Sequence, residues 1–235
     1  MFRAPKILDN KKNGKVYEEL VEHLQKGSGV SVISAYFTIY AYAELKKELS
    51  KIDKMQFIFT EPTFVKTDQK QMRQYYIEHV QASKRAIWGN EFEIKLKNEM
   101  KQAAIAKECA KWLLEKVEIK SFKEPNPAQP RLVCIENDKD SIAISGSVDF
   151  TTDGLGFTSS SRIDCNTCVY GKENTMAFLQ MFQELWDDEA AVEDVKKQVL
   201  DQMQTLYKEN TPEFIYFVTL YNVFHNYLDE LTEDN

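Results

Sequence analysis

The chain lacks an apolar run long enough to cross a membrane. The longest such stretch, residues 214–224, is interrupted by Thr219 and Asn222 and falls well short of the roughly 20 residues that span a bilayer. No apolar signal core follows Met1, so we expect a cytoplasmic protein with no membrane contact. Glycine and proline are few, at 8 and 6 of 235 residues, which excludes collagen-like and low-complexity chains. The hydrophobic fraction of 43% predicts one packed domain, alone or with an appendage.

Cysteine and histidine are also scarce, with 4 and 3 residues. A chain of this size needs no disulfides, which again favours a reducing compartment. Cys165 and Cys168 have the C-x-x-C spacing of zinc and redox sites, but no second pair follows. On a strand, residues three apart face opposite sides, so one metal would not easily reach both. None of the histidines, His23, His79 and His225, adjoins a candidate base, and we predict no metal site.

The phosphate-binding loop G-x-x-x-x-G-K-S/T is absent from the sequence. Nothing in these residues therefore binds ATP as a helicase motor does. We predict no cofactor for this segment.

Positive charge is concentrated in the first part of the chain, although the net charge is −7. Residues 1–140 carry 25 Lys and Arg against 20 Asp and Glu, whereas residues 141–235 carry 5 against 17. Residues 84–123 contain ten basic and six acidic residues. Within this segment we single out Lys107 and Lys111 as candidate contacts to a polyanion. Mixed charge on an exposed helix is also common without a ligand, so both interpretations stay open.

Hydrophobic periodicity predicts an α/β protein. Residues 15–25 and 41–52 have helical spacing, and the strand-like runs 30–35 and 55–59 around the second helix form a βαβ unit with a parallel strand pair. We expect a mixed, largely parallel sheet flanked by helices over residues 1–186 and a helical appendage over residues 187–235. The remaining expected helices are 68–80, 93–117, 173–186, 190–209 and 212–231, and the remaining expected strands are 117–122, 132–136, 142–145 and 163–170.

The most informative segment is a predicted hairpin. Its first strand reads Gln-Pro-Arg-Leu-Val-Cys-Ile-Glu over residues 129–136, and its second ends in Ser-Gly-Ser-Val-Asp-Phe-Thr over residues 145–151. This layout resembles the phospholipase D superfamily signature, H-x-K, four residues, D, then G-S-x-N-F. The corresponding residues here are Gln129, Arg131, Glu136, Gly146, Ser147 and Asp149.

Two further segments resemble a particular subgroup. Residues 30–37 are similar to the first strand of the phospholipase D-like domain at the amino end of bacterial superfamily-two, Snf-type helicases. Residues 211–217 are similar to the connector that precedes the helicase motor there. The resemblance implies a DNA or RNA helicase whose motor, with its ATP and Mg²⁺, lies beyond Asn235.

The departures from the signature bear on catalysis. In the family a histidine attacks the phosphodiester and a second histidine acts as general acid, the second coming from a twofold-related subunit when only one motif is present. The single motif here therefore implies a homodimer through this site. Gln129 stands at the nucleophile position, and an amide is a very poor nucleophile that does not titrate near neutrality. We expect no catalysis from this segment.

The motif residues could still bind phosphate without catalysing its transfer. Arg131 replaces the lysine, and a guanidinium holds phosphate oxygens at least as well. Asp149 replaces the asparagine and works against an anion, so Arg131 either contacts phosphate or pairs with Glu136 or Asp149. Thr151 and Arg162 belong to a hydroxyl-rich loop that is either a phosphate cradle or a solvated loop, and Ser147 of the motif is a further candidate for phosphate binding.

The leading interpretation is a non-catalytic accessory domain that contacts nucleic acid, dimerises, or does both. One alternative is an active single-motif phosphodiesterase or nuclease with rearranged residues. Another is a protein-interaction module built on the aromatic face of residues 214–224.

Overall fold

The computed structural model describes residues 3–60, 91–124, 131–159, 161 and 163–208. The chain divides into two compact units, one of residues 1–65 and 108–201 and the other of residues 66–107 and 202–235. We call the first the sheet unit, because it contains every strand that the structure describes. The described residues of the second unit are helical and belong to the first part of one long helix and the end of another.

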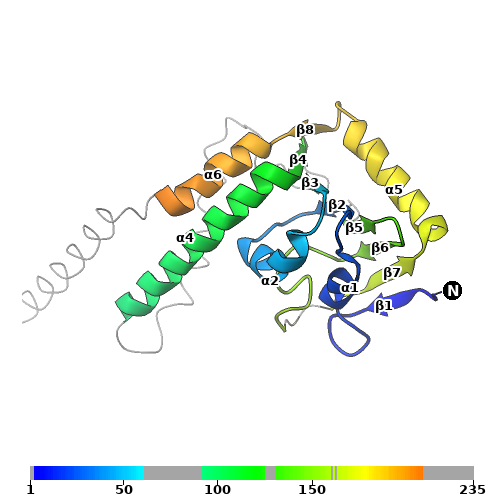
Figure 1. Ribbon diagram of the computed structural model, residues 1–235, viewed down its shortest axis with the longest axis horizontal. Coiled ribbons are helices and arrows are strands. Elements are labelled where there is room, and N and C mark those ends of the chain that lie inside the picture. The colour runs from blue at the N-terminus through cyan, green and yellow to red at the C-terminus, as the bar shows by residue number, and fades with distance from the viewer. Residues whose placement is uncertain (1–2, 61–90, 125–130, 160, 162, 209–235) are drawn as a thin grey trace, which may run out of the picture. The chain divides into compact units, whose positions relative to one another are not determined.

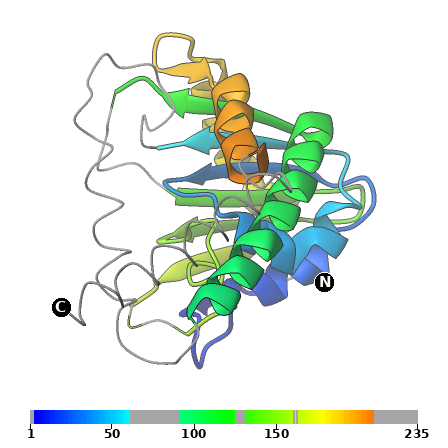
Figure 2. The ribbon, with the colours of Figure 1, turned by 90° about the vertical axis from the view of Figure 1, so that its left-hand side faces the viewer.

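An eight-stranded sheet forms the centre of the sheet unit (Figure 1). Its strand order is β1-β7-β6-β5-β2-β3-β4-β8, and Figure 2 shows these strands lying one above the other. The strands are β1 (Lys6–Leu8), β2 (Gly29–Ser34), β3 (Lys54–Phe59), β4 (Val117–Phe122), β5 (Arg131–Glu136), β6 (Ser141–Gly146), β7 (Asn166–Tyr170) and β8 (Val192–Asp194). The described helices are α1 (Val16–His23), α2 (Ile39–Leu49), α4 (Glu91–Lys116), α5 (Lys172–Asp187) and α6 (Lys196–Lys208).

The mixed α/β class is confirmed, but the expectation of a largely parallel sheet is wrong. Among the described strands, β3 pairs in parallel with β2 and with β4, and every other pairing is antiparallel. Parallel neighbours need a long crossover, which α2 supplies between β2 and β3. Strands β5, β6 and β7 instead follow one another antiparallel, as the predicted hairpin of β5 and β6 already indicated.

Two short edge strands were not predicted. Strands β1 and β8 have three residues each, too few for an alternation of polar and apolar side chains to show. The helix predicted over residues 190–209 is α6, and it begins only at Lys196 because residues 192–194 pair with β4. The predicted helices at 68–80 and 212–231 lie outside the described residues, and the domain boundary at 186/187 stays a prediction.

Helices pack on both faces of the sheet. Figure 1 shows α1 and α2 on one side of the strands and α5 on the other. Beside α2, the indole Nε1 of Trp112 donates to the backbone oxygen of Leu49 at 3.1 Å. On the opposite face, Phe182 and Trp186 of α5 pack in one buried cluster with Ile33, Ile58, Leu132 and Cys134 of the sheet. None of the helices described is long and apolar enough to cross a membrane.

Candidate phosphate-binding site

The β-hairpin brings the two halves of the motif together. In the antiparallel register of β5 and β6, Arg131 lies opposite Gly146, so Ser147 and Asp149 follow directly beside the start of β5. Gly146 has φ 150°, and a Cβ there would lie 2.3 Å from the carbonyl oxygen of Cys165. The close approach of the β7 segment therefore requires glycine at this position.

Arg131 pairs with Asp149. The guanidinium Nε lies 2.6 Å from Oδ1 of Asp149, whose side chain is 4% exposed, whereas the Arg131 side chain is 32% exposed. Of the two partners considered from the sequence, Glu136 is excluded because it lies at the other end of β5, opposite Ser141. Among the described residues, nothing else binds the guanidinium. Its two Nη groups therefore keep their N–H donors available.

The Asp149 carboxylate is held from several sides. Its Oδ1 accepts a hydrogen bond from the backbone N of Ala35 at 3.2 Å and lies 3.2 Å from the hydroxyl of Ser34. The same hydroxyl oxygen accepts from the backbone N of Phe150 at 2.9 Å and lies 2.8 Å from the carbonyl oxygen of Tyr36. Buried Ser34 thus ties the end of β2 to the segment that follows β6. Sequence reasoning missed Ser34, whose only signal was a hydroxyl at the end of an apolar strand.

Ser147 forms structural contacts. Its backbone N donates to Oδ1 of Asn166 at 2.8 Å, and its hydroxyl donates to Oδ1 of buried Asp164 at 3.1 Å. The backbone N of Cys165 in turn donates to the Ser147 hydroxyl at 3.3 Å. A phosphate at Ser147 would meet the Asp164 carboxylate, so the arrangement favours a role in joining β6 to β7.

Thr151 stabilises its own loop. Its hydroxyl donates to Oδ1 of Asp153 at 2.7 Å and accepts from the backbone N of Gly154 at 3.0 Å. Asn10 supports the same loop from the N-terminal side, because its amide Nδ2 donates to both Gly154 O and Asp164 Oδ2 at 2.9 Å. The other predicted member of this cradle, Arg162, lies outside the described residues.

Some of the residues on which catalysis would depend lie outside the described part of the chain. Gln129, His79 and His225 fall there. His23 is described, and its Nδ1 lies 2.8 Å from the carbonyl oxygen of Glu19. The Asn137 amide, in the turn between β5 and β6, donates to the His23 carbonyl oxygen at 3.4 Å. His23 therefore lies at the end of the hairpin opposite to Arg131.

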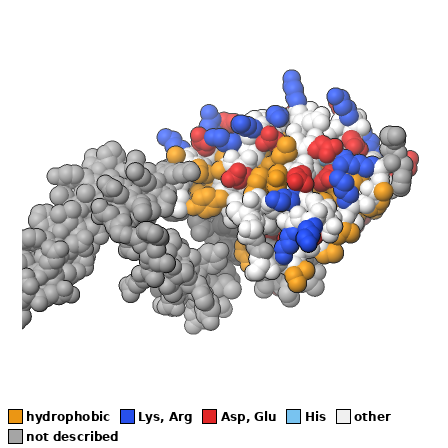
Figure 3. All heavy atoms as spheres, turned by 90° about the horizontal axis from the view of Figure 1, so that it is seen from below, with side chains coloured by type: hydrophobic (Ala, Val, Ile, Leu, Met, Phe, Trp, Pro, Cys, Tyr) orange, Lys and Arg blue, Asp and Glu red, His pale blue; other side chains and the backbone are white. Residues whose placement is uncertain are grey.

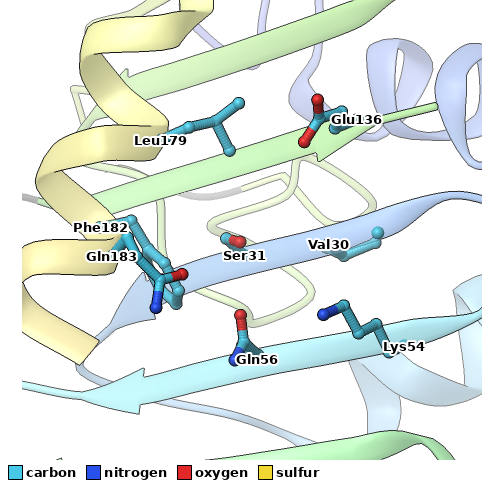
Figure 4. A pocket seen from close by; sticks show the side chains of 9 residues that line it. Val30, Ser31, Lys54, Gln56, Glu136, Leu179, Phe182 and Gln183 are labelled. Carbon is cyan, nitrogen blue, oxygen red and sulfur yellow. The ribbon is translucent and has the colours of Figure 1, made fainter. Parts of the chain in front are cut away.

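Glu136 belongs to a different feature, a depression on the α5 face of the sheet with a volume of about 300 Å³. Figure 4 shows it above Ser31, with Lys54, Gln56 and Glu136 on the strands and Leu179 and Phe182 on α5. Lys54 and Glu136 flank Gly29 in register, and both side chains are exposed. The depression lies at the opposite end of β5 from Arg131, so the structure separates two residues that the motif groups together.

The lysines predicted on the long helix are exposed. Lys107 and Lys111 lie one turn apart on α4, and Lys111 Nζ is 4.0 Å from Oε1 of Glu115. Figure 3 shows Lys and Arg side chains interspersed with Asp and Glu on the face it presents. That face therefore carries mixed charge instead of a continuous basic patch.

A second charged cluster ties β1 to α1. Glu19, 4% exposed at its side chain, accepts from Lys6 Nζ at 2.8 Å and from an Nη of Arg3 at 3.2 Å, and Arg3 also binds Glu22 at 3.0 Å. Ligand-type atoms of Glu19, Glu22 and His23 lie within 4.8 Å of one another. Because Arg3 and Lys6 already contact both carboxylates, this cluster has the chemistry of an ion-pair network.

The cysteines are free thiols. Cys165 is exposed and precedes β7, whereas Cys168 is buried within it, so the strand predicted over residues 163–170 begins only at Asn166 and does not include Cys165. Burial raises the pKa of Cys134 to about 12 and that of Cys168 to about 11.

Comparison with known proteins gives limited information. No family model and no curated protein matches the chain. Among solved structures, phosphatidylserine synthase of Haemophilus influenzae Rd KW20 is 11% identical with a TM-score of 0.45, covering 88% of this chain and 44% of that one. Polyphosphate kinase of Porphyromonas gingivalis is 10% identical with a TM-score of 0.44, covering 82% of this chain and 24% of that one.

Neither of these two proteins is a helicase by its name, and this chain spans less than half the length of each.

Proposed function

We propose that the chain is a non-catalytic, phospholipase D-like domain that contacts nucleic-acid phosphate through Arg131. The observation that supports this most is the geometry of the Arg131–Asp149 pair. Within the described part of the chain, only Asp149 binds the guanidinium, through Nε, which leaves both Nη groups available on a side chain that is one-third exposed. A guanidinium held in this way binds phosphate oxygens without losing further side-chain freedom.

The same residues argue against turnover. Phosphodiester cleavage of this type needs an imidazole as nucleophile. Gln129 supplies an amide at the motif position, and the described His23 lies at the other end of the hairpin. The Ser147 hydroxyl, the nearest alternative in the motif, is engaged by Asp164. We therefore propose binding without hydrolysis.

Fluorescence anisotropy with labelled single-stranded and duplex oligonucleotides tests the binding. We expect Arg131→Gln to weaken binding about tenfold, the size of a lost charge-assisted hydrogen bond. Lys139→Gln is the matched control, because Lys139 is exposed in the turn at the other end of the same hairpin and carries the same charge. Equal affinities of the two variants would contradict the proposal.

Incubation of the protein with nicked, single-stranded and duplex DNA, with and without Mg²⁺, tests the absence of turnover. We expect intact DNA and no covalent phospho-protein at stoichiometric protein concentrations. Cleavage that survives in Arg131→Gln indicates a contaminating nuclease, whereas cleavage that this substitution abolishes would establish the alternative of an active phosphodiesterase.

We also propose that this domain associates with a second copy of itself and with a helicase motor. A homodimer through this site rests on the resemblance of the single motif, and association with a downstream helicase motor rests on the resemblance of residues 30–37 and 211–217. Light scattering at micromolar concentration should return twice the 27.3 kDa chain mass. A monomer would remove dimerisation from the proposal and leave the Arg131 contact to be judged on its own.

A further inference from the structure

Tyr36 is an exposed aromatic side chain beside the Arg131–Asp149 pair. It follows β2 directly and is 50% exposed, although its neighbours Ala35 and Phe37 are buried or half-buried. An aromatic ring half in solvent contributes little to a core. The role of the Tyr36 ring therefore depends on the groups that surround it.

The bridge between the two segments places Tyr36 next to Asp149. Phe37 and Phe150 form a parallel bridge, and the backbone N of Thr38 donates to the carbonyl oxygen of Phe150 at 3.1 Å. The rings of Phe37 and Phe150 stack with centroids 5.3 Å apart and planes 3° apart. Tyr36 and Asp149 are the residues that precede this bridge in the two segments, so they are neighbours across it.

Asp149 in turn links this position to Arg131. Asp149 Oδ1 accepts from Arg131 Nε and also from the backbone N of Ala35, the residue before Tyr36. Ser34 connects the same carboxylate oxygen to the Tyr36 backbone, since its hydroxyl lies 2.8 Å from the Tyr36 carbonyl oxygen. The exposed residue Tyr36 and the Arg131 guanidinium are thus joined, through the Tyr36 backbone and the Asp149 carboxylate, in one hydrogen-bonded network.

We propose that this edge of the sheet binds single-stranded nucleic acid, with one base stacked on Tyr36 and an adjacent phosphate held by the Nη groups of Arg131. The inference rests on the proposed function and specifies its substrate class. Aromatic stacking plus a backbone cation is the usual chemistry of single-strand recognition and tolerates any sequence. Duplex fits less well, because its bases already stack on one another and present no free face to Tyr36.

An oligonucleotide without bases distinguishes the stacking contact at Tyr36 from the phosphate contact at Arg131. We compare an oligo(dT) with an abasic strand of equal length by anisotropy, using the wild-type chain and the variants Tyr36→Ala, Tyr36→Phe and Met176→Ala. Met176 is the control for loss of an exposed apolar side chain, since it is 66% exposed on α5. Circular dichroism establishes that each variant is folded.

Stacking of one base predicts that Tyr36→Ala weakens oligo(dT) binding about tenfold. Binding of the abasic strand should not change, and Tyr36→Phe and Met176→Ala should behave as the wild type. The inference is overturned if the wild type binds both strands equally, or if Tyr36→Ala and Met176→Ala have the same affinity. The proposed function fails separately, if Arg131→Gln leaves abasic-strand binding unchanged.

Discussion

Two arginine–carboxylate pairs in this protein have nearly the same exposure and very different bonding. Asp149 and Glu19 are each 4% exposed at the side chain, and their partners Arg131 and Arg3 are 32% and 34% exposed. Arg3 gives both Nη groups to Glu19 and Glu22, and its guanidinium lies over the Tyr170 ring at 3.9 Å. Among the described residues, Arg131 bonds only to Asp149, through Nε.

The comparison shows that exposure alone does not make an arginine a ligand site. Arg3 is bonded internally and joins the N-terminal residues to α1, with Lys6 supporting the same carboxylate. A ligand there would have to replace existing ion pairs. Arg131 keeps donors for a ligand, because Asp149 orients it through a single nitrogen.

Loss of either buried carboxylate should have the largest effect on stability. We expect Asp149→Ala and Glu19→Ala each to lower the free energy of unfolding by about 3–5 kcal/mol, because removal of one partner leaves cations and N–H groups uncompensated. Urea denaturation followed by circular dichroism measures both.

Oligonucleotide binding by the same two variants distinguishes the Arg131–Asp149 pair from the Arg3–Glu19 pair. Where they stay folded, only Asp149→Ala should weaken oligonucleotide binding, because it releases the Arg131 side chain. If Glu19→Ala weakened binding equally, the distinction between the two arginines would be wrong.

Ser34 supports the Arg131 pair and has a matched control on the same strand. Ser34→Ala should cost about 1–3 kcal/mol, since it leaves the buried backbone N–H of Phe150 without its acceptor. The half-buried Ser31 forms no described hydrogen bond through its side chain, and Ser31→Ala should change stability by less than about 0.5 kcal/mol. Chemical denaturation of both variants gives the difference, and equal losses would remove Ser34 from this account.

Thiol reactivity reports on the Arg3 pair. Exposed Cys165 should react with a disulfide reagent first, whereas burial raises the pKa of Cys134 to about 12 and of Cys168 to about 11 and protects both. Cys168 lies within the electrostatic reach of Arg3, Lys6 and Glu19. The positive charge of Arg3 favours the Cys168 thiolate, so Arg3→Gln should slow labelling of Cys168 and leave Cys134 unchanged, as measured by mass spectrometry of labelled peptides. Equal acceleration at both cysteines would indicate general loosening instead.

The smallest expected effect is the acid response of Glu22. The hydrogen bond from Arg3 lowers the pKa of Glu22 below its ordinary 4.5. A depressed carboxyl pKa adds stability above pH 4.5, and that contribution is lost as the pH falls through the folded-state value. Because the pair is exposed, Glu22→Gln should remove about 0.5 kcal/mol or less of this pH dependence. If Glu22→Gln left the pH dependence of stability between pH 5 and pH 3 identical to that of the wild type, Arg3 would hold Glu19 alone.

Local patterns predicted a good part of the fold and one half of the site. The hairpin of β5 and β6, the βαβ unit and the possible Arg131–Asp149 pair all follow from residues near one another in sequence or from one motif. The antiparallel character of the sheet did not follow, because strand direction depends on connections far apart in the chain.

The partners that complete the network were missed for the same reason. Ser34 meets Asp149 across 115 residues and Asn10 meets Asp164 across 154, and neither serine nor asparagine carries a signal that selects so distant a partner. Residues 129 and 162, which the motif and the cradle called for, lie outside the described part of the chain.

The salt dependence of oligonucleotide binding tests the central claim most directly. Each phosphate contact contributes about one unit to the slope of log affinity against log salt concentration. We predict that Arg131→Gln lowers the slope by about one relative to the wild type, while Arg3→Gln and Lys139→Gln leave it unchanged. A slope in Arg131→Gln equal to that of the wild type would contradict the claim that this arginine offers its free donors to phosphate.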